Sequence, residues 1–228
     1  MCVTPQKDRN KYVFLHIGKC AGSSVYHKLI QWSSINNLEL EYSHLAHVTS
    51  IDSWDVKKFI IVLRNPIERF ISAFYWRYMG TVDTDKQRFR FKGEYEILKE
   101  CKTVENYVQK IKKEGVKYRD GFQSGYHIQH LPQDINWYLR PLISSNKSDS
   151  IYKVVVQENI IEDMKTHFNL NMNIKTHENK NEKYDRFLSD DSKEVLKDIL
   201  KKDYECIETL YKWNKITDKQ YKLLINEA

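Results

Sequence analysis

Lys11-Tyr-Val-Phe-Leu-His-Ile-Gly-Lys-Cys-Ala-Gly-Ser-Ser-Val25 is the stretch that decides the fold. Its residues 12–17 are aromatic, β-branched or apolar apart from one histidine, which predicts a strand of a parallel sheet that is buried on both faces. The apolar run stops at Gly18, Lys19 and Gly22. We therefore expect a tight turn directly after this strand.

A helix is predicted after the turn. Ser23 and Ser24 are typical N-cap residues, and apolar side chains follow at helical spacing, namely Val25, Leu29 and Trp32. The first N–H groups of such a helix, and the positive end of its dipole, point back into the turn. A phosphate group would fit there, with Lys19 as a cation beside it.

The order of residues in the turn excludes one common phosphate-binding motif. A Walker A loop ends in Gly-Lys-Ser/Thr, whereas Lys19 precedes Gly22 and no residue matches the Mg²⁺ position. Gly-Lys-x-Ala-Gly-Ser-Ser after a strand instead resembles the 5'-phosphosulfate loop of sulfotransferases that use 3'-phosphoadenosine 5'-phosphosulfate (PAPS), in particular the carbohydrate enzymes of the heparan sulfate 2-O and chondroitin type. The resemblance implies a P-loop-like turn in which the cofactor is bound by Gly18, Lys19, Cys20, Ala21, Gly22, Ser23 and Ser24.

A second segment extends this resemblance. The apolar run 58–63 leads into Arg64-Asn-Pro-Ile-Glu-Arg-Phe-Ile-Ser72, where Pro66 suits the first turn of a helix. In the same sulfotransferases an Arg at a strand end and a Ser eight residues later bind the 3'-phosphate of PAPS, which matches Arg64 and Ser72. Asn65 stands where Asp is usual in the family, and we expect this change to weaken local packing.

The catalytic base implied by the family is a histidine between the two phosphate segments. His47 matches it best, and His44 is the second candidate. The resemblance also suggests Gln123 as the counterpart of a glutamine-containing segment of the family. It suggests Lys180 and Lys183 as contacts to phosphate or adenine, with a solvated loop as the alternative. Cys20, inside the anion loop at a helix start, is expected to have a lowered pKa and a reactive thiol.

Length and composition limit the classes of protein to which this chain can belong. The 228 residues are expected to form one domain, 1–228, and the net charge of +6 with 31 acidic residues interspersed does not indicate a nucleic-acid-coating protein. No apolar run is long enough to cross a membrane, which predicts a cytoplasmic protein. The four cysteines are widely spaced, so neither a zinc site nor a disulfide framework is indicated.

Together these features predict an α/β fold. Strands at 12–17, 59–63 and 151–156, separated by helices, imply a central parallel sheet with its site at the carboxyl ends of the strands. The segment 80–102 is expected to be a mobile loop. The segment Leu188-Ser-Asp-Asp191 is expected to cap a helix that is part of a helical carboxyl-terminal region.

The predicted reaction is in-line transfer of the sulfuryl group of PAPS to a hydroxyl of an acceptor, with 3',5'-ADP as the product, His47 as base and no metal. Lys19 would stabilise charge on the leaving phosphate. Family analogy alone favours a carbohydrate acceptor. Two alternatives remain at this point: an ATP-dependent kinase of similar fold, and a non-catalytic nucleotide-binding protein. The oligomeric state is not indicated.

Overall fold

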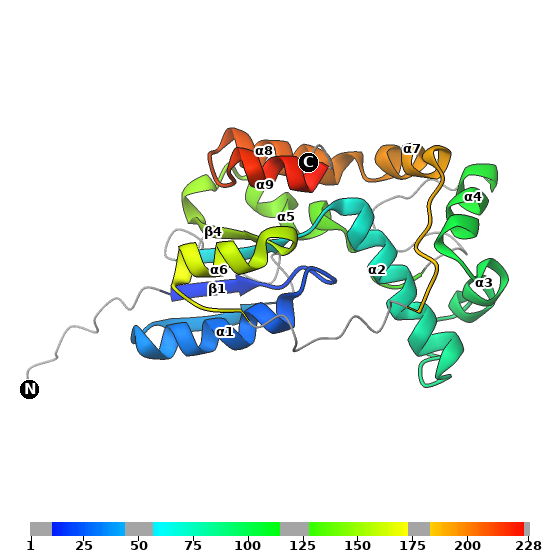
Figure 1. Ribbon diagram of the computed structural model, residues 1–228, viewed down its shortest axis with the longest axis horizontal. Helices are drawn as coiled ribbons and strands as arrows, with labels where there is room; N and C mark the ends of the chain where they lie inside the picture. Colours follow the sequence, from blue (N-terminus) through cyan, green and yellow to red (C-terminus); the bar gives the residue numbers. More distant parts are fainter. Residues whose placement is uncertain (1–10, 44–56, 115–127, 173–182, 226–228) are drawn as a thin grey trace, which may run out of the picture.

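A four-stranded, all-parallel sheet forms the centre of the protein (Figure 1). The computed structural model describes residues 11–43, 57–114, 128–172 and 183–225. The strands are β1 (Lys11–Leu15), β2 (Glu39–Ser43), β3 (Lys57–Leu63) and β4 (Ile151–Val156), in the order β2-β1-β3-β4. Lys11 is aligned with Glu39 on one side and with Lys57 on the other. The α/β class with a central parallel sheet is confirmed, and the three expected strands occur within two residues of their predicted bounds.

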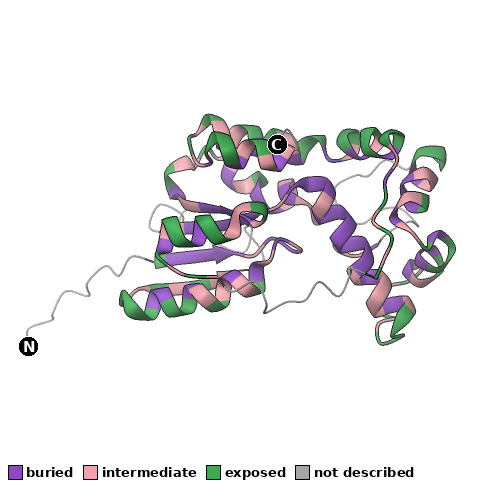
Figure 2. Cartoon of the chain, in the orientation of Figure 1, coloured by how far each residue is buried: buried purple, intermediate pink, exposed green. Residues whose placement is uncertain are grey.

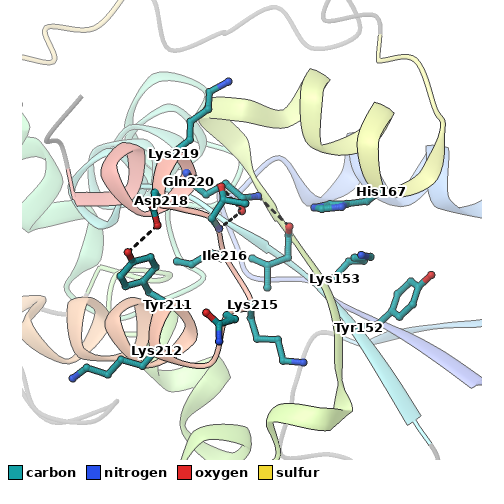
Figure 3. A pocket seen from close by; sticks show the side chains of 13 residues that line it. Tyr152, Lys153, His167, Tyr211, Lys212, Lys215, Ile216, Asp218, Lys219 and Gln220 are labelled. Atoms are coloured by element: carbon teal, nitrogen blue, oxygen red, sulfur yellow. Dashed lines mark hydrogen bonds between the residues drawn. The ribbon is translucent and has the colours of Figure 1, made fainter.

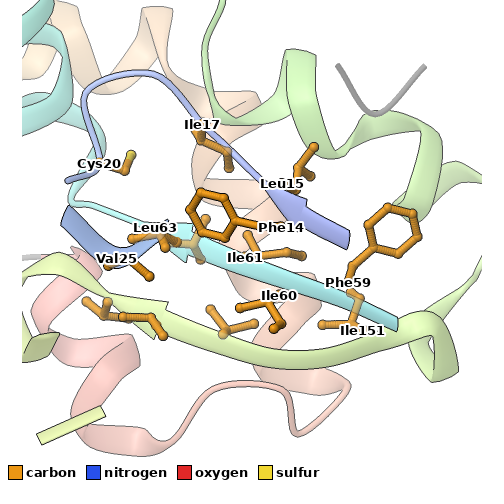
Figure 4. Packing of buried hydrophobic residues seen from close by; sticks show 14 of the residues in the cluster. Phe14, Leu15, Ile17, Cys20, Val25, Phe59, Ile60, Ile61, Leu63 and Ile151 are labelled. Carbon is orange, nitrogen blue, oxygen red and sulfur yellow. The ribbon is translucent and has the colours of Figure 1, made fainter. Parts of the chain in front are cut away.

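Helices cover both faces of the sheet, which explains why its two central strands are apolar apart from the lysines at their amino ends. On one face α1 (Gly22–Ile35) meets α6 (Ile160–Phe168) through the rings of Trp32 and Phe168, whose centroids are 5.1 Å apart. On the other face α5 (Ile135–Ser144) packs against α8 (Lys201–Lys212). The apolar side chains of β1 and β3 fill the space between these layers and are excluded from water (Figures 2 and 4).

A second hydrophobic cluster lies beyond the carboxyl ends of the strands. It is built from α2 (Pro66–Tyr78), α3 (Glu94–Cys101), α4 (Val104–Glu114) and α7 (Asp190–Ile199). Ser189 caps α7 by accepting a hydrogen bond from the Ser192 N–H, so the helix expected after 188–191 is present, with Ser189 as its cap. The chain continues into α8 and α9 (Asp218–Ile225), which gives the expected helical carboxyl-terminal region.

The segment 80–102 is not a structureless loop, so that prediction is wrong. A turn of π-helix, Met79–Asp83, follows α2, and α3 ends the segment. Arg77 donates to both carboxylate oxygens of Glu94, at 2.9 and 2.6 Å, and both side chains are almost fully buried. A charged pair held away from water in this way fastens α3 to the end of α2.

Helix α5 is also not predicted from the sequence. Asp134 caps α5 by accepting a hydrogen bond from the Trp137 N–H at 2.7 Å. The apolar residues of α5 follow at helical spacing, but Pro141 interrupts the pattern. Two short 3₁₀ turns, Ser148–Ser150 and Gln157–Asn159, flank β4.

The edge strand β4 is covered by polar side chains from the carboxyl-terminal helices. Lys215 Nζ donates to the Ile151 carbonyl at 3.1 Å, and Gln220 Nε2 donates to the Val154 carbonyl at 3.4 Å. A cavity of about 890 Å³ lies along this edge, lined by β4, α6, α8 and α9 (Figure 3). None of the predicted site residues lines this cavity. Its polar side chains donate hydrogen bonds to carbonyl groups of β4 that no neighbouring strand of the described sheet could bind, so we interpret this region as a cover for the sheet edge.

No helix in the described parts of the chain combines the length and the apolar character needed to cross a membrane.

Candidate functional site

The turn between β1 and α1 has two residues with left-handed backbone conformation, Lys19 (φ 71°) and Ala21 (φ 58°). Neither is glycine, so each conformation is strained, by roughly 1–3 kcal/mol. Ala21 is the N-cap of α1, which begins at Gly22, and no side chain caps the helix. The prediction that Ser23 and Ser24 cap the helix is therefore wrong, because both lie inside its first turn. Ser23 is exposed and Ser24 is partly buried.

Gly22 is required by a close approach. A Cβ at this position would lie 1.8 Å from His16 Cδ2, because the imidazole of His16 lies against the start of α1. The His16 ring is itself held by a 2.7 Å hydrogen bond between its Nδ1 and the Tyr42 hydroxyl. Any side chain at Gly22 would therefore displace either His16 or the turn.

Lys19 is folded onto an aromatic ring of α2. Its Nζ lies 4.6 Å from the centroid of the Trp76 ring, a cation–π contact. Burial, together with the nearby positive charges of Arg64 and Arg69, lowers the pKa of Lys19 to about 7. Positive charge is thus concentrated around the turn, and it disfavours the protonated form of Lys19.

Arg64, at the end of β3, braces the turn. Its Nη1 donates to the Lys19 carbonyl at 3.4 Å, and its Nη2 donates to Glu68 Oε2 at 3.2 Å. Glu158 Oε1 lies 3.9 Å from Arg64 Nε, and Arg186 also pairs with Glu68. The structure therefore brings Arg64 to the anion loop, with two carboxylates beside it.

Asn65 strengthens this junction, so the expectation that it weakens packing is wrong. Its Oδ1 accepts a hydrogen bond from the Glu68 N–H at 3.1 Å and so caps α2. Its Nδ2 donates to the Leu224 carbonyl at 2.7 Å, and its backbone N–H donates to Glu158 Oε1 at 3.0 Å. An aspartate could not make the Leu224 bond, because an ionised carboxylate has no donor.

Arg69 was not singled out from the sequence, yet it is the most deeply placed cation of the site. The side chain is fully buried. Its Nη1 donates to the Gly18 carbonyl at 3.4 Å, and both Nη atoms donate to the His130 carbonyl at 3.2 and 3.3 Å. Nη2 also donates to the Leu131 carbonyl at 3.1 Å. Within the described residues no carboxylate pairs with Arg69, and its Nε has no hydrogen-bond partner.

The predicted site residues Ser72 and Cys20 are both buried, Ser72 on α2 and Cys20 in the turn itself. Among the described residues the Ser72 hydroxyl bonds to neither Arg64 nor the turn. Cys20 is fully buried, with its Sγ 3.9 Å from the Gly18 carbonyl. Burial raises the pKa of Cys20 to about 12, so the expectation of a lowered pKa is wrong. The increase in pKa caused by burial is larger than any decrease caused by the helix dipole.

Two further side chains from outside the predicted motifs contact Gly18. His130 Nδ1 and the Tyr138 hydroxyl each lie 3.5 Å from the position that a Cβ on Gly18 would take. Tyr138 is on α5, a helix not predicted from the sequence, and burial raises its pKa. Nothing in the spacing of the sequence relates His130 to Gly18.

Several predicted site residues lie outside the described residues, namely His44, His47, Gln123 and Lys180. Lys183 is described, and its Nζ lies 2.6 Å from Asp83 Oδ2 beside the Tyr184 ring. Within the described ranges no group of three or more His, Cys, Asp or Glu side chains could hold a metal ion.

The described site is therefore a strand–turn–helix with an uncapped helix start, next to three clustered cations. Comparison of the chain with family models, curated proteins and solved structures finds no match.

Proposed function

We propose that this chain is a PAPS-dependent sulfotransferase that transfers a sulfuryl group to a hydroxyl of an acceptor. One observation carries the proposal: Lys19 and Arg69 lie at the same turn, and neither has a carboxylate partner among the described residues. Desolvated positive charge without a counter-ion is unfavourable unless an anion binds. The strained backbone of the turn and the open start of α1 favour the same ligand class.

The donor set fits a nucleotide with phosphate groups. Lys19 and the first N–H groups of α1 would bind the 5'-phosphosulfate, and Arg64 with Ser72 would bind the 3'-phosphate. For this, Arg64 would exchange part of its contact with Glu68 for phosphate oxygens, to which its planar guanidinium is suited. PAPS supplies an activated sulfuryl group, and Lys19 would stabilise negative charge as it develops on the leaving phosphate.

The family resemblance alone makes His47 a candidate for the base and a carbohydrate the proposed acceptor. Neither a metal ion nor a nucleic acid has a part in it. An ATP-dependent kinase would use the same kind of turn, so the first experiment must separate the two donors.

Calorimetry with 3',5'-ADP in the absence of Mg²⁺, set against ATP with Mg²⁺, makes this separation. We expect 3',5'-ADP to bind and ATP to bind at least tenfold more weakly. Incubation with PAPS labelled in its sulfuryl group and a panel of glycans should then give labelled product. Lys19→Met should lose binding of 3',5'-ADP, whereas Lys28→Met, a change further along α1, should not. Preference for ATP with Mg²⁺ would refute the proposal.

A further inference from the structure

The side chain of His130 faces the anion loop together with Lys19. Its Nδ1 lies 3.5 Å from where a Gly18 Cβ would be. Its ring meets the Trp76 ring edge-on, with centroids 4.9 Å apart and an interplanar angle of 84°. Lys19 Nζ lies over the same Trp76 ring at 4.6 Å. The ring of Trp76 thus contacts both the imidazole of His130 and the ammonium group of Lys19.

The position of His130 is fixed by the residue that also fixes the loop. Arg69 donates both Nη atoms to the His130 carbonyl and one of them to the Gly18 carbonyl. His130 also has left-handed backbone conformation, with φ 71°. Such a conformation costs free energy and persists only where the surroundings hold it. The imidazole is therefore held at a set position relative to the turn.

The contact with Trp76 positions the imidazole ring but leaves its Nδ1 atom without a partner among the described residues. This atom is buried, although buried polar side-chain atoms usually have a hydrogen-bond partner. The groups that surround it electrostatically are all cationic: Lys19, Arg69, Arg77 and Arg90. Burial and these charges lower the pKa of His130 to about 4, so the ring is neutral at physiological pH and carries a free lone pair.

We propose that His130 binds the acceptor hydroxyl and takes its proton during sulfuryl transfer, an inference that rests on the proposed function. In this step the acceptor O–H bond breaks and its proton moves to the imidazole. The acceptor oxygen forms a bond to sulfur while the bond from sulfur to the 5'-phosphate oxygen breaks. That electron pair stays on 3',5'-ADP, and the imidazolium later releases its proton to water.

Binding of the nucleotide makes this role more favourable. The four cations that suppress protonation of His130 would then face a bound polyanion, which offsets their charge and raises the pKa of the imidazole. A base that becomes stronger only after the donor has bound is suited to transfer in the complete complex. His47, which the family resemblance favours, is the competing assignment.

The test replaces His130 by Asn. Asparagine tolerates left-handed backbone better than most residues but cannot accept a proton at this pH, so His130→Asn keeps the backbone and removes the base. We expect the variant to keep its affinity for 3',5'-ADP within about threefold and to lose ~10²–10⁴ in kcat. His27→Asn, an exposed change on α1, should leave both quantities unchanged.

Two further measurements separate a base from a merely structural residue. Added imidazole should restore part of the transfer in His130→Ala, whereas it should not restore a variant that is only misfolded. NMR titration of the His130 ring should show a low pKa that rises when 3',5'-ADP is added, a result that requires no turnover.

The outcomes distinguish this inference from the function on which it rests. Parental protein that transfers from PAPS, together with a fully active His130→Asn, would refute the role of His130 and leave the sulfotransferase standing. If His47→Asn loses transfer and added imidazole rescues that variant but not His130→Ala, the base is His47. Parental protein that neither binds 3',5'-ADP nor transfers would refute the function itself.

Discussion

The lowered pKa of Lys19 predicts that nucleotide binding takes up a proton. In the free protein the pKa is about 7, against an ordinary value of 10.5, because the amine is desolvated and lies near Arg64 and Arg69. A bound phosphate would pair with the ammonium and raise the pKa again. The complex then holds more protons than the free protein, so affinity is greatest below about pH 7 and falls as the pH rises.

The size of the effect follows from the two pKa values. If the pKa returns to its ordinary value in the complex, affinity for 3',5'-ADP falls about 20-fold between about pH 7.5 and about pH 9. About 0.9 proton is then taken up per nucleotide near pH 8. This range lies above the phosphate pKa of about 6, so titration of the ligand contributes little.

Calorimetry in two buffers with different ionisation enthalpies measures the proton uptake directly. Lys19→Arg is the matched control, because a guanidinium stays charged over this whole range and should bind without proton uptake. Parental protein whose affinity does not change with pH would refute the reasoning. So would a Lys19→Arg variant that keeps the parental slope, since the titrating group would then be a different one.

Four other substitutions test the surroundings of the site. Arg64→Ala and Ser72→Ala should each lower the discrimination between 3',5'-ADP and 5'-AMP in calorimetry; unchanged discrimination would contradict the 3'-phosphate assignment. Gly22→Ala should destabilise the fold by about 1–3 kcal/mol in urea denaturation and abolish nucleotide binding, because its Cβ has no room. Glu94→Ala leaves the buried Arg77 without its anionic partner, with only Gln87 and Thr81 as hydrogen-bond acceptors among the described residues, and should cost about 3–5 kcal/mol in the same assay; a loss below about 1 kcal/mol would show that the pair relaxes into water.

Local signals in the sequence predicted the sheet and the start of α2 well. Short, continuous apolar runs rich in β-branched and aromatic residues favour strands covered on both faces, and Pro66 suits the first turn of a helix. The same signals placed Lys19 and Arg64 at one edge of the sheet, since parallel strands end together. Arg64 Nη1 does reach the Lys19 carbonyl, as this reasoning requires.

The remaining features depend on contacts that no local pattern specifies. Arg69 looks like an ordinary helical arginine, because its acceptors are carbonyls 51 to 62 residues away. Glu94 and its neighbours resemble a solvated loop until their buried partner Arg77 is known. Cys20 has the sequence context of a reactive thiol, and only its complete burial reverses the direction of the pKa shift.

The hydrogen bond from Asn65 to the Leu224 carbonyl joins a residue made early in translation to one made late, so it can form only after α9 has been synthesised. The two residues are 159 positions apart, so β3 leaves the ribosome long before α9 does. At about 5–20 residues per second the delay is roughly 8 to 30 s. During that interval the amide of Asn65 lacks its acceptor, and the start of α2 has only its local cap. A nascent chain that stops before Leu224 therefore lacks this hydrogen bond at Asn65, the residue after Arg64, and the junction of β3 with α2 is complete only once α9 has been made.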